Sequence, residues 1–445
     1  MENSAFLFKK FFLLMTVVMV FFSGCHDDVD ELTEQYPFLE GIINVPTETL
    51  CGAAPKKMKF LAGQHIEAGE VEISNDLKNL YISVNTKNNW FFGATHIYVG
   101  SKANMPLGGG GNPKIGNFPY KSSHDPLVQS YLLTIPLDKL DPCFVIAVHA
   151  EAFKLDDKGK VVQKETAWAE GEQIKASGSW AMNFDYCLEE CVIKYPIEAV
   201  ATLAFEDLYP IKGDADYNDM VLDMAARQYY SGRQIKRIEM EFNLKARGTI
   251  YDHEFAIRVP LNGSANIKIE RFNATDAQAV ETENMSGVGG ENLKIVVFPS
   301  TKQVLLSTQG HFSSNTLAGT LLKTPTTRTK VTIYVEEGHL MLSAPFDPYL
   351  HVKETDQKIH IIEITQKIDA DGDGNKDYWE DEEGIHPFGI IMHKDWQWPL
   401  EYVNILDVYP DFKYVIEGGV FKAKRFDWYK TPADGSDYFR PELFN

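Results

Sequence analysis

The segment "QIKRIEMEFNLKARGTI", from Gln234 to Ile250, alternates apolar with polar side chains. Successive side chains of a strand point to opposite faces of a sheet, so this period of two predicts a half-buried β-strand. The second half of the chain repeats the pattern in "HEFAIRVPL", "LKIVVFPS", "TKVTIYVEE" and "KIHIIEIT". We therefore expect the chain beyond about residue 197 to form a β-rich unit.

The first half of the chain has short runs rich in β-branched and aromatic residues, which are separated by turn residues. They are "GEVEISND", "NLYISVNTK", "THIYVG", "YLLTIPL" and "CFVIAVHAEAF". Many short strands joined by turns are typical of a β-sandwich or barrel. We predict an all-β dominated fold with two β-sandwich-like domains in tandem, at residues 59–192 and 193–445.

The period changes in "PLEYVNILDVYPDFKYVIEGG", residues 399–419, where apolar residues recur at helical spacing. Proline suits the first turn of a helix, and glycine suits its end. We expect one short helix to start at Pro399, and a second to start at Pro410 and end near Gly418. The second domain is therefore predicted to carry a short C-terminal helical cap.

The composition limits the function. The 445 residues include 63 acidic and 43 basic residues, which gives a formal net charge of −20. A nucleic-acid partner would need a basic face, so none is expected. An excess of carboxylates suits a soluble surface protein or a protein that binds cations.

The N-terminus has the features of an export signal. The apolar run "FFLLMTVVMVFF" (Phe11 to Phe22) is shorter than the roughly 20 residues of a membrane span. The "SGC" that follows ends at Cys25 and resembles the lipobox of bacterial lipoproteins. This resemblance implies that residues 1–24 are a signal peptide and that the acylated Cys25 anchors the chain to a membrane. The alternative is an ordinary secretory signal with a chance cysteine.

Residues 25–58 are predicted to form a tether that begins with the acidic "HDDVDELTE". Acidic residues directly after a lipoprotein cysteine resemble a signal for export to the outer face of the outer membrane. This predicts a lipid-anchored protein of the outer membrane, exposed on the cell surface. The alternative is a solvated linker without a sorting role.

Four cysteines remain beyond the lipidation site. In an exported protein an even number of cysteines permits two disulfides, here with three pairings left open. A zinc site is less expected, because no histidine cluster accompanies the cysteines. These residues are Cys51, Cys143, Cys187 and Cys191.

The segment "DADGDGNKDYWE" (Asp369 to Glu380) fits the twelve-residue calcium loop of EF-hands at every liganding position. Calcium prefers six to eight hard oxygen ligands, so calcium is the expected cofactor. The sequence before the loop reads as a strand rather than a helix, so we expect a calcium loop set in a β domain. The alternative is an acidic surface loop without metal. The predicted ligands are Asp369, Asp371, Asp373, Asn375, Asp377 and Glu380.

A second acidic stretch is "FEDLYPIKGDADYNDMV" (Phe205 to Val221). Its carboxylates and its asparagine could form another calcium site, with Gly213 allowing the chain to turn. The alternative is a hydrogen-bonded turn, since Asp and Asn form Asx-turns without a metal. The candidate ligands are Glu206, Asp207, Asp214, Asp216, Asn218 and Asp219.

The same stretch resembles the opening signature of the LruC-type domain of bacterial outer-membrane lipoproteins. "YDHEFAIRVP", "APFDPYLHV", "HPFGIIM" and "FDWY" are similar to later segments of that family, in the same order. The resemblance covers residues 197–445, and the β unit before it resembles a module of other exported proteins. It implies a lipidated envelope protein with no established enzymatic activity, and it adds support for the second calcium site.

Nucleophile elbows, zinc-binding HExxH motifs, phosphate loops and dinucleotide fingerprints do not occur in the sequence. We therefore expect no enzyme. The leading hypothesis is a calcium-binding surface or adhesion module with a glycan, matrix protein or envelope protein as ligand. The alternatives are a glycan-active hydrolase, whose carboxylate pair has no short signature, and a structural subunit of an envelope assembly.

Overall fold

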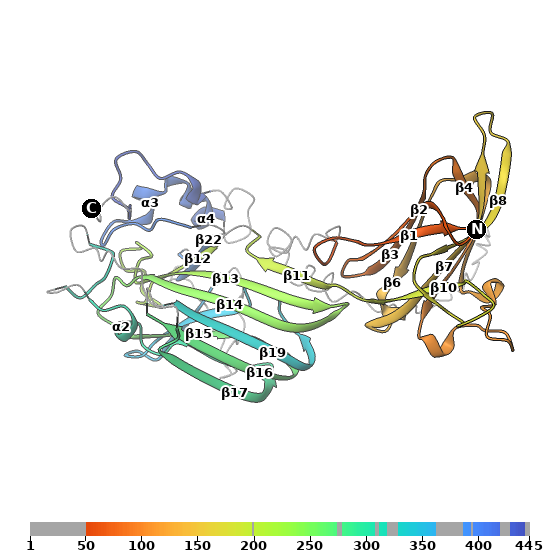
Figure 1. The fold of residues 1–445 in the computed structure, drawn as a ribbon. Coiled ribbons are helices and arrows are strands. Elements are labelled where there is room, and N and C mark those ends of the chain that lie inside the picture. Colours follow the sequence, from red (N-terminus) through yellow and green to blue (C-terminus); the bar gives the residue numbers. More distant parts are fainter. Residues whose placement is uncertain are drawn as a thin grey trace, which may run out of the picture.

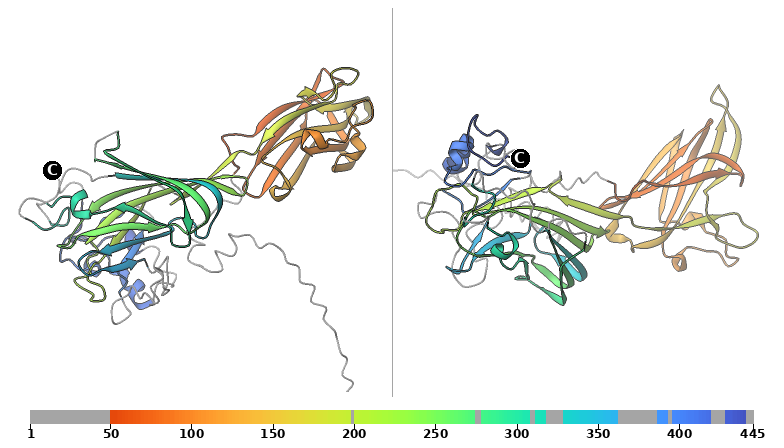
Figure 2. Two further views of the ribbon diagram at one scale, coloured as in Figure 1. Left: turned by 90° about the horizontal axis from the view of Figure 1, so that it is seen from below. Right: turned by 60° about the vertical axis from the view of Figure 1, so that its left-hand side comes forward.

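The computed structural model describes residues 50–197, 200–273, 278–307, 311–317, 328–361, 386–392, 395–418 and 428–440. These residues are mostly antiparallel β-sheet with a small helical region near the C-terminus, as predicted (Figure 1). Two β bodies are visible in every view, and the chain passes from one to the other along β11 (Figures 1 and 2). None of the helices in the described ranges has the length and apolar character that a membrane span requires.

The first body is one antiparallel sheet with the strand order β5-β4-β7-β8-β1-β2-β3-β6, extended by β10 and β9. Its end strands β5 and β6 are joined by Gln129 alone, so the sheet curls back on itself around one apolar core. The strands are β1 (Lys56–Ala62), β2 (Ile66–Asn75), β3 (Asn79–Thr86), β4 (Trp90–Gly100), β5 (Tyr120–Val128), β6 (Ser130–Pro136), β7 (Cys143–Leu155), β8 (Val161–Ala169), β9 (Glu172–Gln173) and β10 (Met182–Cys187). Short 3₁₀ turns are η2 (Lys102–Asn104), η3 (Ile115–Asn117) and η4 (Leu137–Lys139).

The second body packs two antiparallel sheets face to face. The larger sheet has the order β17-β16-β19-β14-β13-β12-β22, with β11 also paired to β13, and the smaller has the order β18-β15-β20-β21. The larger sheet contains β11 (Glu190–Tyr195), β12 (Ala201–Phe205), β13 (Met220–Ser231), β14 (Gln234–Ala246), β16 (Leu261–Phe272), β17 (Glu281–Gly290), β19 (Arg328–Leu340) and β22 (Gly389–Met392). The smaller sheet contains β15 (His253–Arg258), β18 (Lys294–Phe298), β20 (Asp347–Val352) and β21 (Gln357–His360).

The alternation in β14 explains how this sandwich forms. Met240, Phe242 and Leu244 are fully buried between the two sheets, while the polar residues between them face away. Strand β12, "ATLAF", does not alternate because both of its faces are covered. Leu203 enters the sandwich core, whereas Ala204 packs under the C-terminal region. An apolar run without alternation is what burial on both faces produces.

The C-terminal region covers the outer face of β12 and β22. It contains α3 (Ile405–Val408), η5 (Pro410–Phe412), α4 (Lys413–Gly418) and η6 (Trp428–Lys430), and a further short helix, α2 (Thr301–Val304), follows β18. The prediction that a helix starts at Pro399 is wrong. The first helix begins at Ile405, and the side chain of Asn404 caps it by accepting a hydrogen bond from the backbone N–H of Leu406. Pro399 instead forms an isolated β-bridge with Tyr438.

Both disulfides lie in or next to the first body. Cys143 and Cys187 face each other on the paired strands β7 and β10. Cys51 is bonded to Cys191, which lies on β11 and therefore in the larger sheet of the second body. This second disulfide ties the two bodies together where the chain crosses between them.

Candidate metal centre

The second acidic stretch forms the loop between β12 and β13, two neighbouring strands of the larger sheet. Glu206 directly follows β12, and the chain folds back on itself at Gly213, which has a φ of 68°. A Cβ atom at Gly213 would lie 3.2 Å from Oε2 of Glu206. Glycine at this position therefore lets the second half of the loop approach the first half closely.

Three carboxylates converge in this loop. Ligand oxygen atoms of Glu206, Asp214 and Asp216 all lie within 4.8 Å of one another. Glu206 and Asp216 are each only 2% exposed, while Asp214 is exposed at the rim. In the described part of the chain none of the three forms a salt bridge. Such a set of hard oxygen atoms suits a divalent cation such as calcium.

The electrostatics of these carboxylates are unfavourable without a cation. Burial, followed by the charges of Asp216 and Asp214, raises the pKa of Glu206 well above its ordinary value. Burial, followed by the charge of Asp214, raises the pKa of Asp216 to about 8. The opposing contributions are hydrogen bonds from backbone N–H groups rather than ion pairs. Strongly raised carboxylate pKa values of this kind are a mark of functional sites.

Backbone N–H groups fix the orientation of two of these carboxylates. The N–H of Tyr217 donates to Oε1 of Glu206. Asp216 accepts at Oδ1 from the N–H of Asn218, at 3.1 Å, and at Oδ2 from the N–H of Tyr402, at 2.9 Å. These hydrogen bonds hold the carboxylate oxygens in fixed orientations, as a preorganised binding site requires.

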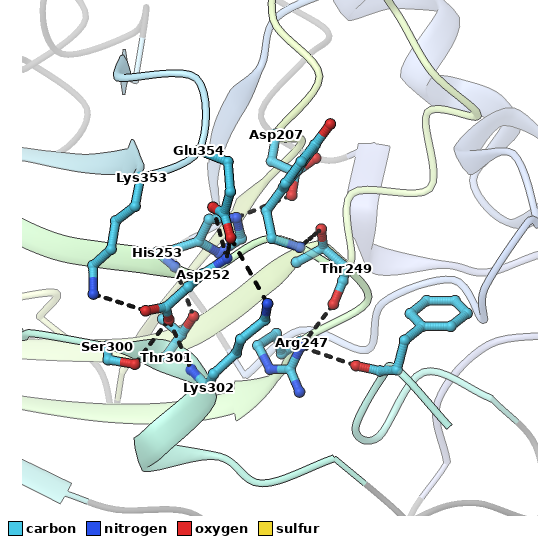
Figure 3. Close-up of polar contacts among 12 residues, drawn as sticks. Asp207, Arg247, Thr249, Asp252, His253, Ser300, Thr301, Lys302, Lys353 and Glu354 are labelled. Atoms are coloured by element: carbon cyan, nitrogen blue, oxygen red, sulfur yellow. Dashed lines mark hydrogen bonds and ion pairs between the residues drawn. The ribbon is translucent and has the colours of Figure 1, made fainter. Parts of the chain in front are cut away.

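Asp207 and Asp219 are held by other contacts. Oδ2 of Asp207 lies 3.0 Å from Nε2 of His253 on β15, and its backbone N–H donates to Oδ2 of Asp219 at 2.8 Å. Figure 3 shows this contact and the polar network around it. Asp252, the residue before His253, accepts from Nζ of Lys353 at 2.7 Å. Asp207 therefore anchors the loop to the smaller sheet instead of joining the three converging carboxylates.

Asn218 lies at the opposite end of the loop and is fully buried. Its Nδ2 donates to the carbonyl of Pro399 at 3.1 Å, but its Oδ1 has no hydrogen-bond partner among the described residues. A Cβ atom at Gly248 would lie 1.9 Å from that Oδ1 and 2.9 Å from Oε2 of Glu401. Two oxygen atoms from distant parts of the chain thus meet over one glycine. Arg247, the residue before this glycine, donates to the carbonyls of Thr249 and Phe312 and holds the neighbouring loops (Figure 3).

Glu401 is a candidate functional residue that the sequence analysis missed. Burial, together with the charges of Asp214 and Asp207, raises its pKa to about 7. Its Oε2 accepts a hydrogen bond from Oγ1 of Thr316 at 2.8 Å. Glu401 lies in a predominantly apolar segment far from the acidic loop in sequence. The feature that could have marked it as a site residue is that it is a lone acidic residue in "PLEYVN".

The other predicted sites lie outside the described residues. These are the twelve-residue calcium loop, with Asp369, Asp371, Asp373, Asn375, Asp377 and Glu380, and the lipidation site Cys25. Trp396, Trp398 and Trp428 are buried and pack in the core beneath the C-terminal helices.

The geometry of the three carboxylates fits cation binding better than glycoside hydrolysis. A retaining glycosidase separates its two carboxylates by about 5–5.5 Å and an inverting enzyme by about 6.5–9.5 Å, around a sugar that must enter between them. Here the oxygen atoms lie within 4.8 Å, and two of the three carboxylates are almost fully buried. This spacing and burial suit a small cation as the ligand better than a sugar ring.

Comparisons with known proteins find a family model and solved structures. One similar solved structure is a candidate lipoprotein from Bacteroides ovatus, with a TM-score of 0.42 and 14% identity, covering 67% of this chain and 93% of that one. No curated protein matches. Residues 233–429 match a protein family described as a domain of unknown function, DUF4842. The match does not name the LruC family, and it includes Glu401 but not the acidic loop. The C-terminal region of the chain is therefore similar to the DUF4842 family over residues 233–429.

Proposed function

We propose that this protein is a calcium-binding, lipid-anchored protein of the outer membrane that acts as a surface binding module. The observation that carries the calcium assignment is the convergence of Glu206, Asp214 and Asp216 without a cationic partner in the described residues. Burying several carboxylates together is strongly unfavourable unless a cation compensates their charge. An ion at this site would turn their mutual repulsion into attraction.

Calcium is proposed over magnesium for a geometric reason. Magnesium requires a near-ideal octahedral shell with short bonds, and it gives up its water molecules reluctantly. Calcium accepts irregular sets of six to eight oxygen atoms. The loop offers carboxylates that differ in burial, together with an open rim at Asp214, and such an irregular set suits calcium.

The location and the ligand are proposed from the sequence. Cys25 follows an apolar run of signal-peptide length, and an acidic tether follows it. Acylation of this cysteine would hold the two β bodies at the membrane surface. We propose a glycan, a matrix protein or another envelope protein as the ligand, and the resemblance to LruC-type lipoproteins fits this role.

Isothermal titration calorimetry on the full chain in detergent, stripped of metal with EGTA, tests the calcium site. We expect two classes of calcium site, one in the acidic loop and one in residues 369–380. Glu206→Gln should remove the first class, and Asp371→Asn should remove the second. Glu241→Gln, which makes the same change at an exposed position of β14, should remove neither. Two calcium sites that survive in Glu206→Gln would refute the assignment.

A further inference from the structure

The segment from Pro399 to Ile405 lies directly on the acidic loop. The N–H of Tyr402 donates to Oδ2 of Asp216 at 2.9 Å. Nδ2 of Asn404 donates to the carbonyl of Asp214 at 3.0 Å. One residue further on, the N–H of Ile405 donates to the carbonyl of Ala215 at 2.9 Å. The stretch that carries two of the three converging carboxylates is therefore hydrogen-bonded along its length to the C-terminal segment.

The same loop also contacts the helices that follow this segment. The ring of Tyr217 lies 5.4 Å from that of Phe412 in an edge-on arrangement. The hydroxyl of Tyr217 donates to the carbonyl of Pro387, and its backbone N–H donates to Glu206. Tyr217 thus joins the carboxylate cluster to the apolar core beneath the C-terminal helices, which also includes Trp396.

Glu401 brings a negative charge to the contact between the acidic loop and the segment from Pro399 to Ile405, which we call the seam. It lies within electrostatic range of Asp214 and Asp207 on the acidic loop. Without a cation, these like charges push the segment away from the loop. A divalent cation in the loop offsets two of these negative charges, so the repulsion that Glu401 meets becomes much weaker. Glu401 therefore gives the segment a direct response to the state of the metal site.

One further group at the seam points to a cation. Oδ1 of Asn218 is completely buried and has no hydrogen-bond partner in the described part of the chain. It faces Oε2 of Glu401 over Gly248, where the loop and the segment meet. A buried amide oxygen beside a carboxylate is a potential cation ligand.

Building on the proposed calcium site, we propose that the ion bound by the acidic loop is a latch that holds the C-terminal segment, residues 399–418, against the sheet. Calcium binding closes the seam between the loop and this segment, and calcium removal lets the segment open transiently. The partner of the metal site is therefore a part of the same chain, and Glu401 is the positioning residue through which that part responds.

Hydrogen–deuterium exchange with mass spectrometry on the full chain tests the latch. Amides in residues 399–418 should exchange about tenfold more slowly with calcium than with EGTA, because the opening becomes rarer. Peptides from β7 in the first body serve as an internal reference and should not change. Equal slowing in β7 would indicate general stabilisation and would overturn the latch.

Variants separate the latch from the calcium site itself. Glu206→Gln should abolish calcium binding by the loop and the slowing of amide exchange in residues 399–418. The other proposed calcium site, residues 369–380, is unchanged in this variant. Glu401→Gln should still bind calcium in the loop, but its segment should be better protected in EGTA, so calcium should slow exchange several-fold less than in the parent. Calcium binding without any change in exchange would overturn the latch and leave the proposed function standing. A lack of binding by the loop would overturn the proposed function.

Discussion

The sharpest test of the acidic loop is to remove one charge without changing its shape. In Glu206→Gln the amide oxygen can still accept the hydrogen bond that the N–H of Tyr217 donates to Oε1. The new NH₂ group can donate to the carboxylates of Asp214 or Asp216, which now receive a donor in place of a negative charge. The substitution therefore removes repulsion and keeps the hydrogen bond.

The expected effect follows from the distances. At an effective dielectric constant of about 20, two unit charges 4.8 Å apart repel each other by about 3.5 kcal/mol. Three mutually close charges form three such pairs, and the substitution removes two of them. In the metal-free protein, proton uptake by the carboxylates relieves part of this repulsion. At pH 8 the substitution should therefore raise the free energy of unfolding by only a part of the removed repulsion, about 2–3 kcal/mol.

The pH dependence has a defined sign. The folded-state pKa of Asp216, about 8, lies above its ordinary value of 3.8. The folded, metal-free protein therefore binds more protons than the unfolded chain between these two values, and its stability falls as the pH rises through this window. By pH 7 the loss from this one carboxyl group is on the order of 4 kcal/mol.

Urea unfolding in EGTA at pH 5, 7 and 8, followed by tryptophan fluorescence, measures these effects. The metal-free parent should lose stability as the pH rises, and Glu206→Gln should lose less and become the more stable protein at pH 8. At millimolar calcium the order should reverse, because only the parent gains the additional stability that an ion in the acidic loop supplies. A metal-free Glu206→Gln that is less stable than the parent at pH 8 would refute the repulsion on which the calcium site is argued.

Three further predictions concern other parts of the fold. Gly248→Ala should cost about 2–4 kcal/mol and weaken calcium binding, since its Cβ has no room, whereas Gly110→Ala, with open space around it, should do neither in the same titration and melt. Burial lowers the pKa of His149 to about 4, so the parent should lose up to about 3 kcal/mol more than His149→Gln as the pH falls from about 6.5 to 4 in urea unfolding. Replacing both Cys51 and Cys191 by serine should cost about 2–5 kcal/mol in melting experiments, because that disulfide closes a span of 140 residues.

The strands could be predicted because their pattern is local. The alternation of β14 follows from which face of one strand is buried, and neighbouring residues are enough to reveal it. The helix start was mispredicted because the distant acidic loop decides it. Pro399, Tyr402 and Asn404 form hydrogen bonds with the loop, and the helix begins only after them, at Ile405.

The sequence alone could also predict that the loop forms a candidate site. It could not predict which carboxylates converge there and which are held by other residues. Asp207 and Asp216 are the same residue type in one short loop. Asp207 meets His253 from another sheet, and Asp216 meets Tyr402 from the C-terminal segment. Sequence spacing indicates which oxygens are available, whereas the tertiary partners decide which of them remain free for a cation.

The magnitudes also decide how the metal-free protein should behave. Four apolar side chains of residues 399–418, those of Ile405, Val408, Tyr409 and Phe412, are each at most 2% exposed, and burying a side chain of this kind contributes about 1.5–3 kcal/mol. Together they favour docking by roughly 6–12 kcal/mol, before the entropy of ordering the segment is counted. Repulsion of about 3.5 kcal/mol per charge pair is large enough to raise the population of an open state but too small to expel the segment. Calcium should therefore change the frequency of a rare opening rather than the average fold, which amide exchange detects and circular dichroism does not.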